Sequence, residues 1–139
     1  MAYIDTSALL KWYIPEIGSE RVDRYLSTAD SVEISRLTCL EIECAIKRRT
    51  RAGSLSEREA GQVVGQFQSD LYDGLFTLYQ MTERIFLHAQ ELLRRIRAPL
   101  RSLDALHLAT AAQHGGVLVT ADQVLARAAA EASVDAITL

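Results

Sequence analysis

The chain has few of the features that would set it apart from an ordinary globular protein. Its 139 residues include only two cysteines, and no apolar run approaches the roughly 18 residues that cross a membrane. Cys39 and Cys44 fall on one expected helix at a spacing that turns their side chains apart, so neither a mutual disulfide nor a zinc cluster is expected. No basic leader precedes the first apolar residues, and no repeat or low-complexity linker interrupts the chain. We therefore expect a soluble, cytoplasmic protein with no membrane segment, folded as a single domain over residues 1–139.

Positive charge is not in excess either. The formal net charge is −3, which argues against simple binding to polyanions. The distribution is uneven, because eight of the fifteen Lys and Arg residues fall in two clusters, at 47–51 and 94–101. These clusters predict either a locally positive surface or two solvated helix ends, whose cations lie near the negative ends of the helix dipoles.

Short apolar runs alternate with helical patterns along the whole chain. Pro15, Gly53, Pro99 and the pair Gly115-Gly116 end the helical patterns. This alternation predicts parallel βαβ units with right-handed crossovers. The expected fold class is therefore α/β, a three-layer helix–sheet–helix sandwich around a central, mostly parallel sheet, with the last strand at an edge. The expected strands are residues 2–4, 31–34, 75–79, 117–119 and 134–139, and the expected helices are residues 8–13, 19–27, 35–51, 56–71, 83–96, 101–112 and 123–132.

Four acidic residues stand where such a sheet gathers functional groups, near the carboxyl ends of its strands. Asp5 and Asp122 each follow an expected strand, and Asp104 lies in the first turn of a mostly apolar helix. Glu41 lies on a helical stripe that we expect to face inward. Simpler explanations exist, because Asp104 is well placed to cap its helix and Glu41 to pair with an arginine at a helix edge. The stripe consists of Leu37, Glu41, Cys44, Ala45 and Arg48.

Convergence of these acids would itself imply a divalent metal, because carboxylates at close range repel one another unless cations are present. Ligands that are all oxygen favour Mg²⁺ or Mn²⁺ over zinc. Such a site suits hydrolysis of phosphodiesters, since the ion activates water and neutralises charge on the phosphate and the leaving oxygen. Leaving the four acids out changes the formal charge from −3 to +1, so a metal-loaded site need not repel RNA.

With these residues in view, the chain resembles the PIN-domain ribonucleases of the VapC toxin type, the toxic half of VapBC toxin–antitoxin pairs. The resemblance covers essentially the full length, although residues 53–80 match only in general layout. It places the acidic centre on Asp5, Glu41, Asp104 and Asp122, and small hydroxyl positions on Thr6 or Ser7 and on Thr120. The resemblance is based on four segments: YIDTSALLK near the start, SRLTCLEIECAIKR, LDALHLATA, and LVTADQVLARAA near the end.

The resemblance implies cleavage of single-stranded or loop regions of RNA that depends on Mg²⁺ or Mn²⁺. It also implies homodimers and inhibition by a cognate VapB-like antitoxin whose tail covers the active groove. We expect His107 to be packed in the core rather than to act as a general base. Trp12 and Tyr13 could stack on bases or fill a dimer interface, and we favour the interface. The candidates for contact with RNA phosphates, with solvated surface charge as the alternative, are Lys11, Lys47, Arg48 and Arg101.

Two other classes of function stay open. One is an aspartyl-phosphate phosphoryl-transfer domain of the receiver or haloacid-phosphatase kind, which also places Asp at strand ends. Against it, Ser7 stands where the phosphatase pattern needs a second acid, and no lysine follows Lys47 where a receiver needs one on a late strand. The other is a non-catalytic PIN-fold module that binds RNA or a protein partner.

Overall fold

The five strands form one parallel sheet. The computed structural model describes residues 1–139, and its strands lie side by side in the order β3-β2-β1-β4-β5, with every neighbouring pair parallel. The first and last strands therefore belong to the same sheet, and β5 is at an edge, as predicted. The strand bounds are β1 Ala2–Ile4, β2 Val32–Ser35, β3 Phe76–Tyr79, β4 Val117–Thr120 and β5 Ala136–Thr138.

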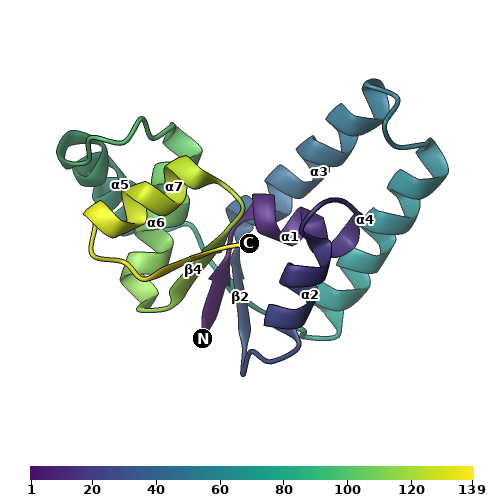
Figure 1. The fold of residues 1–139 in the computed structure, drawn as a ribbon, viewed down its shortest axis with the longest axis horizontal. Helices are drawn as coiled ribbons and strands as arrows, with labels where there is room; N and C mark the ends of the chain where they lie inside the picture. The colour runs from purple at the N-terminus through teal and green to yellow at the C-terminus, as the bar shows by residue number, and fades with distance from the viewer.

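Helices cover both faces of the sheet, which confirms the predicted three-layer α/β sandwich. Figure 1 shows α5, α6 and α7 on one side of the sheet and α1 to α4 on the other, with α3 and α4 projecting together as an arm. Both termini lie near the centre of the view, where the strands are. The helix bounds are α1 Thr6–Tyr13, α2 Ser19–Leu26, α3 Arg36–Arg51, α4 Glu57–Tyr72, α5 Glu83–Arg95, α6 Ser102–His114 and α7 Gln123–Glu131.

The alternation of side chains along β1 divides the core into two halves. Ala2 and Ile4 pack into a cluster with α1 to α4, whereas Tyr3 packs with Leu118 into a cluster with α5, α6 and α7. Successive strand residues point to opposite faces, so a strand of three residues serves both layers. Each strand of the sheet's centre is buried on both sides, which is why β1 and β4 are apolar almost throughout.

The predicted elements are confirmed, with small shifts at their ends. Helix α1 begins at Thr6 rather than at residue 8, because the Asp5 side chain caps it by accepting a hydrogen bond from the Ala8 amide. Helix α6 runs on to His114 and stops at Gly115, whose φ of +69° suits the left-handed cap that glycine adopts readily. The last strand is shorter than predicted and covers Ala136–Thr138.

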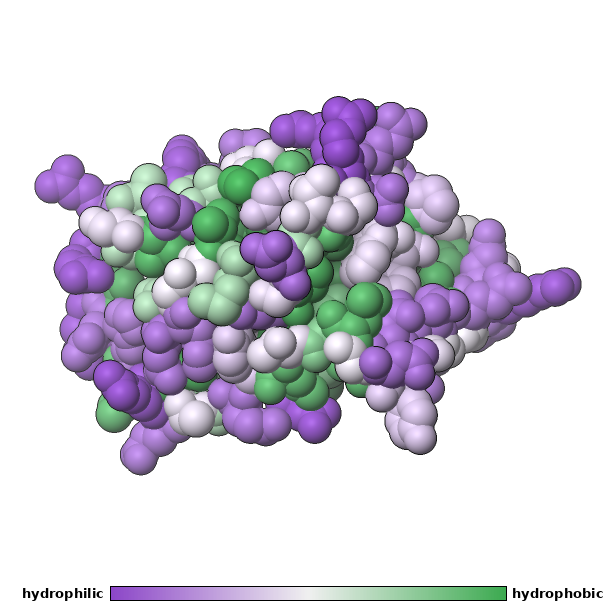
Figure 2. All heavy atoms as spheres, turned by 90° about the horizontal axis from the view of Figure 1, so that it is seen from below, coloured by the Kyte–Doolittle hydropathy of each residue, from purple (hydrophilic) through white to green (hydrophobic).

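One packing expectation was wrong. The inward face of α3 is formed by Leu37, Ile42, Ala45 and Ile46, whereas Cys44 and Arg48 of the predicted stripe are exposed and Glu41 stands at the border, half-buried. The reason is that the second half of α3 leaves the sheet and packs on α4, so no single stripe faces the core along its length. The end of the molecule that carries the α3–α4 turn is hydrophilic in Figure 2.

Both cysteines are free, as predicted. None of the seven helices combines the length and the apolarity that a membrane crossing requires. Where the protein works in the cell stays a prediction.

Candidate functional site

The predicted acids gather at the carboxyl edge of the sheet, and Asp5 is the most buried of them. It follows β1, is 3% exposed, and its Oδ1 accepts a hydrogen bond of 3.0 Å from the Ala8 amide at the start of α1. Burial raises the pKa of the Asp5 carboxyl, and the charge of His107 and the hydrogen bonds from Thr120, Ala8 and Ser7 offset only part of that rise. The carboxyl is therefore costly to ionise where it stands, and a nearby cation would ease that cost.

Small hydroxyl side chains hold Asp5 in place. The Ser7 hydroxyl donates to both carboxyl oxygens, at 2.8 and 2.9 Å, and the Thr120 hydroxyl at the end of β4 donates to Oδ2 at 2.6 Å. The same two hydroxyls accept from the loop after β4, Ser7 from the Ala121 amide at 2.9 Å and Thr120 from the Asp122 amide at 2.9 Å. Ser7 and Thr120, both predicted as supporting positions, thus tie the ends of β1 and β4 together around one acid.

Glu41 reaches the same edge from α3. Its Oε1 accepts from the Thr6 hydroxyl at 2.8 Å and also contacts Nε2 of His107 on α6. Burial alone would raise the pKa of Glu41, but the hydrogen bond and the charge of His107, with Thr6, bring it below its ordinary value. Glu41 is therefore paired with a histidine, not with an arginine at the helix edge as the simpler explanation held.

Asp104 and Asp122 both cap helices. Asp104 Oδ2 accepts from the Arg101 amide at 3.2 Å at the start of α6, and Asp122 Oδ1 accepts from the first amides of α7 at 2.7 and 3.2 Å. Burial raises the pKa of Asp104, and the negative charges of Asp122 and Glu41 raise it further. The helix-cap explanation for Asp104 is thus right, but the negative charges of two other acids also raise the pKa of its carboxyl.

Each of three acids keeps one oxygen without a protein hydrogen-bond partner: Oε2 of Glu41, Oδ1 of Asp104 and Oδ2 of Asp122. Carboxylate oxygens are the ligands that Mg²⁺ and Mn²⁺ prefer, so the chemistry of the donor set fits a hard divalent cation. No three of the acidic, histidine or cysteine side chains, however, lie close enough to hold one ion. The acids therefore lie near enough for the charges of Asp122 and Glu41 to raise the pKa of Asp104, but they do not form a closed metal site.

A cavity of about 480 Å³ leads from these acids along α1 and α3. Thr6, Ser7 and Glu41 line it near the site, and basic side chains line its far part. Glu16 partly neutralises that part, because it pairs with Lys11 at 3.6 Å and with Arg49 at 3.0 Å.

Of the candidates for phosphate contact, Lys11 and Arg48 therefore line this cavity, and Arg48 is the one with no ion pair. Lys47 faces a separate cavity between α3 and α4, and Arg101 is exposed at the start of α6.

The contribution of His107 was missed by reasoning from the sequence. His107 is packed as predicted, at 2% exposed, but its ring also joins Glu41 on one side and the Tyr3 hydroxyl, 2.8 Å from Nδ1, on the other. The signal was its position three residues after Asp104, which places both side chains on the same face of α6.

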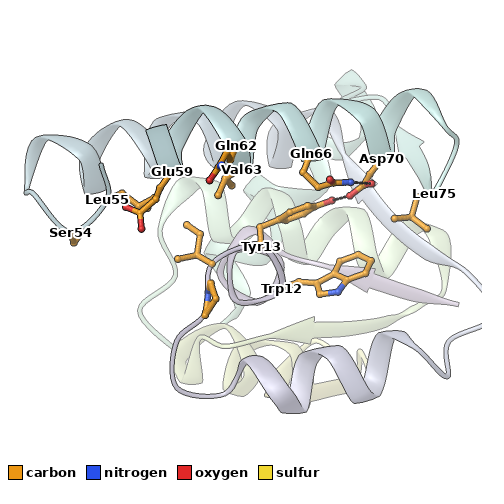
Figure 3. A pocket seen from close by; sticks show the side chains of 12 residues that line it. Trp12, Tyr13, Ser54, Leu55, Glu59, Gln62, Val63, Gln66, Asp70 and Leu75 are labelled. Carbon is orange, nitrogen blue, oxygen red and sulfur yellow. Dashed lines mark hydrogen bonds between the residues drawn. The ribbon is translucent and has the colours of Figure 1, made fainter. Parts of the chain in front are cut away.

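Trp12 and Tyr13 lie away from the acids. Figure 3 shows them beside a cavity of about 830 Å³ between the end of α1 and α4. The Tyr13 hydroxyl donates to Asp70 at 2.5 Å, and its ring meets Phe67 of α4 edge to face, while Trp12 meets Phe76 of β3 in the same way. Tyr13 therefore packs α1 against α4 and Trp12 packs it against β3, and a role at a dimer interface stays a prediction.

Comparison with known proteins adds a family and a fold. The family model described as PIN domain matches residues 2–131. Ribonuclease VapC3 of Pyrobaculum aerophilum is 28% identical over 127 residues, which cover 88% of this chain and 90% of that protein.

Two solved structures share the fold at low sequence identity. VapC20 of Mycobacterium tuberculosis, described as a toxin that cleaves the sarcin–ricin loop, has a TM-score of 0.74 at 16% identity, covering 92% of this chain and 95% of that one. A toxin–antitoxin complex from Klebsiella pneumoniae has a TM-score of 0.66 at 20% identity, covering 88% of this chain and 87% of that one.

Proposed function

Because the chain belongs to the PIN domain family, we propose that it is an endoribonuclease of the VapC toxin type that depends on a divalent metal and acts as a single domain over residues 1–139. The observation that carries the proposal is the set of acids at the carboxyl edge of the sheet, three of which keep an oxygen with no protein partner. The similarity to a protein named as a ribonuclease supports the same reaction.

In this proposal Asp5, Glu41, Asp104 and Asp122 hold Mg²⁺ or Mn²⁺. When bound, such an ion supplies Lewis acidity and positive charge for attack on a phosphodiester. The chain's own part is to orient the acids: Ser7 and Thr120 hold both oxygens of Asp5, and the first amides of α7 hold one oxygen of Asp122. These contacts restrain both carboxyls, and because no three of the acids lie close enough to hold one ion, binding of the ion would have to bring them together.

RNA would enter along the cavity between α1 and α3. Arg48 is the cation best placed there for a phosphate, because Glu16 already pairs with Lys11 and Arg49. We extend the proposal to two partners: a VapB-like antitoxin, supported by the fold shared with a toxin–antitoxin complex, and a second copy of this chain, as the resemblance implies.

Cleavage of a structured RNA by antitoxin-free protein, with Mg²⁺ or Mn²⁺ added, tests the proposal. We expect cutting that stops when the metal is chelated and that is lost in Asp104→Asn, which keeps the shape of the side chain. Asp135→Asn is the matched control, because Asp135 is exposed beside β5 and away from the acids. Equal cutting by Asp104→Asn and wild type would refute the assigned site.

The same assay separates the alternatives. Protein that binds the RNA and leaves it whole with either metal would instead be the non-catalytic binding module. Stable labelling of Asp5 by a small acyl phosphate would indicate phosphoryl transfer.

A further inference from the structure

A line of buried polar side chains runs from the core to the acidic edge. It starts at Ser35, the residue before α3, which accepts a hydrogen bond of 3.0 Å from the Tyr3 hydroxyl of β1. Tyr3 then contacts Nδ1 of His107 at 2.8 Å, and Nε2 of His107 contacts Oε1 of Glu41. Tyr3 and Ser35 are fully buried and His107 is 2% exposed, so water does not compete for the contacts of the Tyr3 hydroxyl.

Both ring nitrogens of His107 are therefore engaged, one on each side. With Tyr3 at Nδ1 and Glu41 at Nε2, rotation of the imidazole would break both contacts at once and leave their polar groups unpaired. Helix α6 supplies the third restraint, because His107 lies in its fully buried stretch from Ala105 to Ala111. The imidazole of His107 is thus held in one orientation at the edge of the core.

Glu41 has no comparable restraint from its own helix. It lies at the border of the buried face of α3, half-exposed, and its long side chain is free to turn except where Thr6 and His107 hold Oε1. These two contacts occupy the same oxygen, and Oε2 has no protein partner. Together they determine which oxygen of Glu41 is presented to the other acids.

We infer that His107 is a positioning residue that holds Oε1 of Glu41, so that Oε2 alone serves the divalent cation. The inference rests on the proposed function, because it takes Glu41 as a metal ligand. His107 does not touch the metal or the substrate in this role. Groups that orient a metal ligand in this way change metal affinity by about 10- to 100-fold when they are removed.

The experiment measures Mn²⁺ affinity by titration calorimetry on the full chain, with folding checked by circular dichroism. We expect His107→Leu, which removes both ring nitrogens at similar volume, to weaken Mn²⁺ binding by about 10- to 100-fold. We expect His107→Gln, whose amide can still donate to Glu41, to restore most of that affinity. His88→Leu is the control, because His88 lies on α5 between that helix and α6 and away from the acids.

A double-variant cycle shows whether His107 acts through Glu41. In a Glu41→Gln background, His107→Leu should change Mn²⁺ affinity by less than about twofold, since the group that it positions is already altered. Should His107→Leu fail to fold, Tyr3→Phe replaces it, because it removes only the hydroxyl that contacts Nδ1. Tyr3→Phe should weaken Mn²⁺ binding several-fold in the wild-type background and not in Glu41→Gln.

The outcomes separate this inference from the proposed function. Wild-type protein that binds no Mn²⁺ would overturn the metal site and this inference with it. Wild-type binding that is unchanged in folded His107→Leu would overturn the positioning role and leave the metal site standing. Equal losses for His107→Leu and His107→Gln, or full additivity with Glu41→Gln, would show that His107 serves only the packing of α6.

Discussion

Glu33 allows a direct test of how much a buried polar atom without a hydrogen-bond partner destabilises this protein. It lies in β2, between Tyr3 of β1 and Thr77 of β3, and is 1% exposed. Its Oε2 is the only buried side-chain nitrogen or oxygen atom without a hydrogen-bond partner. Gly116, the residue before β4, is packed beside it, because an added Cβ there would stand 3.4 Å from that oxygen.

Replacing this carboxyl by an apolar side chain of similar length should therefore stabilise the protein. A buried polar group without a partner costs about 1–3 kcal/mol, and Glu33→Met removes it without opening a cavity. With about 2.1 cal/mol/K of unfolding entropy per residue, a chain of 139 residues gains about 3 °C in Tm for each kcal/mol. The expected rise in Tm is thus about 3–10 °C.

Thermal unfolding followed by circular dichroism measures this effect, with Glu33→Gln as the matched variant. Glu33→Gln keeps the shape and a polar end, so its Tm should rise less. RNA cleavage should be unchanged in both, because Glu33 lies in the first half of β2, away from the carboxyl edge of the sheet. A lower Tm for Glu33→Met would refute the reasoning, since it would mean that the carboxylate has a partner in solution.

Three further outcomes follow from the site and its surroundings. Folding lowers the pKa of Glu41, so the ionised carboxylate stabilises the protein above about pH 4.5, and this stabilisation is lost as the pH falls through the pKa of the folded state. In urea unfolding, the difference in free energy of unfolding between wild type and Glu41→Gln should therefore shrink over that pH range. Tyr13→Phe, which loses the 2.5 Å bond to Asp70, should lower the free energy of unfolding by about 1 kcal/mol and leave RNA cleavage intact. Arg48→Gln should weaken RNA binding and reduce the slope of log affinity against log salt concentration by the equivalent of about one phosphate contact. Glu16→Gln, which frees Lys11 and Arg49, should strengthen RNA binding. Fluorescence anisotropy at several salt concentrations measures both effects.

Much of the fold follows from local patterns along the chain. The expected helix 56–71 corresponds to α4, whose start is marked by a local capping box of Ser56 and Glu59 with both of its hydrogen bonds present. The run before Asp5 predicted a buried strand, and Gly115 predicted the end of α6. These signals work because caps, helix ends and side-chain alternation depend on residues only a few positions apart.

The sequence also predicted which edge of the sheet carries the acids. Parallel strands joined by helices place their carboxyl ends together, so Asp5 and Asp122 had to lie near one another once the strands were recognised. Connectivity does not determine how far one oxygen lies from the next. The structure shows charges that act on one another, with no three donors close enough to hold an ion.

The contacts that decide the state of each site residue belong to the tertiary structure. The Thr120 hydroxyl on Asp5 joins residues 115 positions apart, and the contacts of His107 with Tyr3 and Glu41 join residues 104 and 66 apart. Composition and periodicity carry no record of such pairs, because they arise only when separate helices and strands pack together. The chain's local patterns thus decide where acids and core residues stand, and the approach of α3 to α6 at the carboxyl edge of the sheet decides what Glu41 and His107 do there.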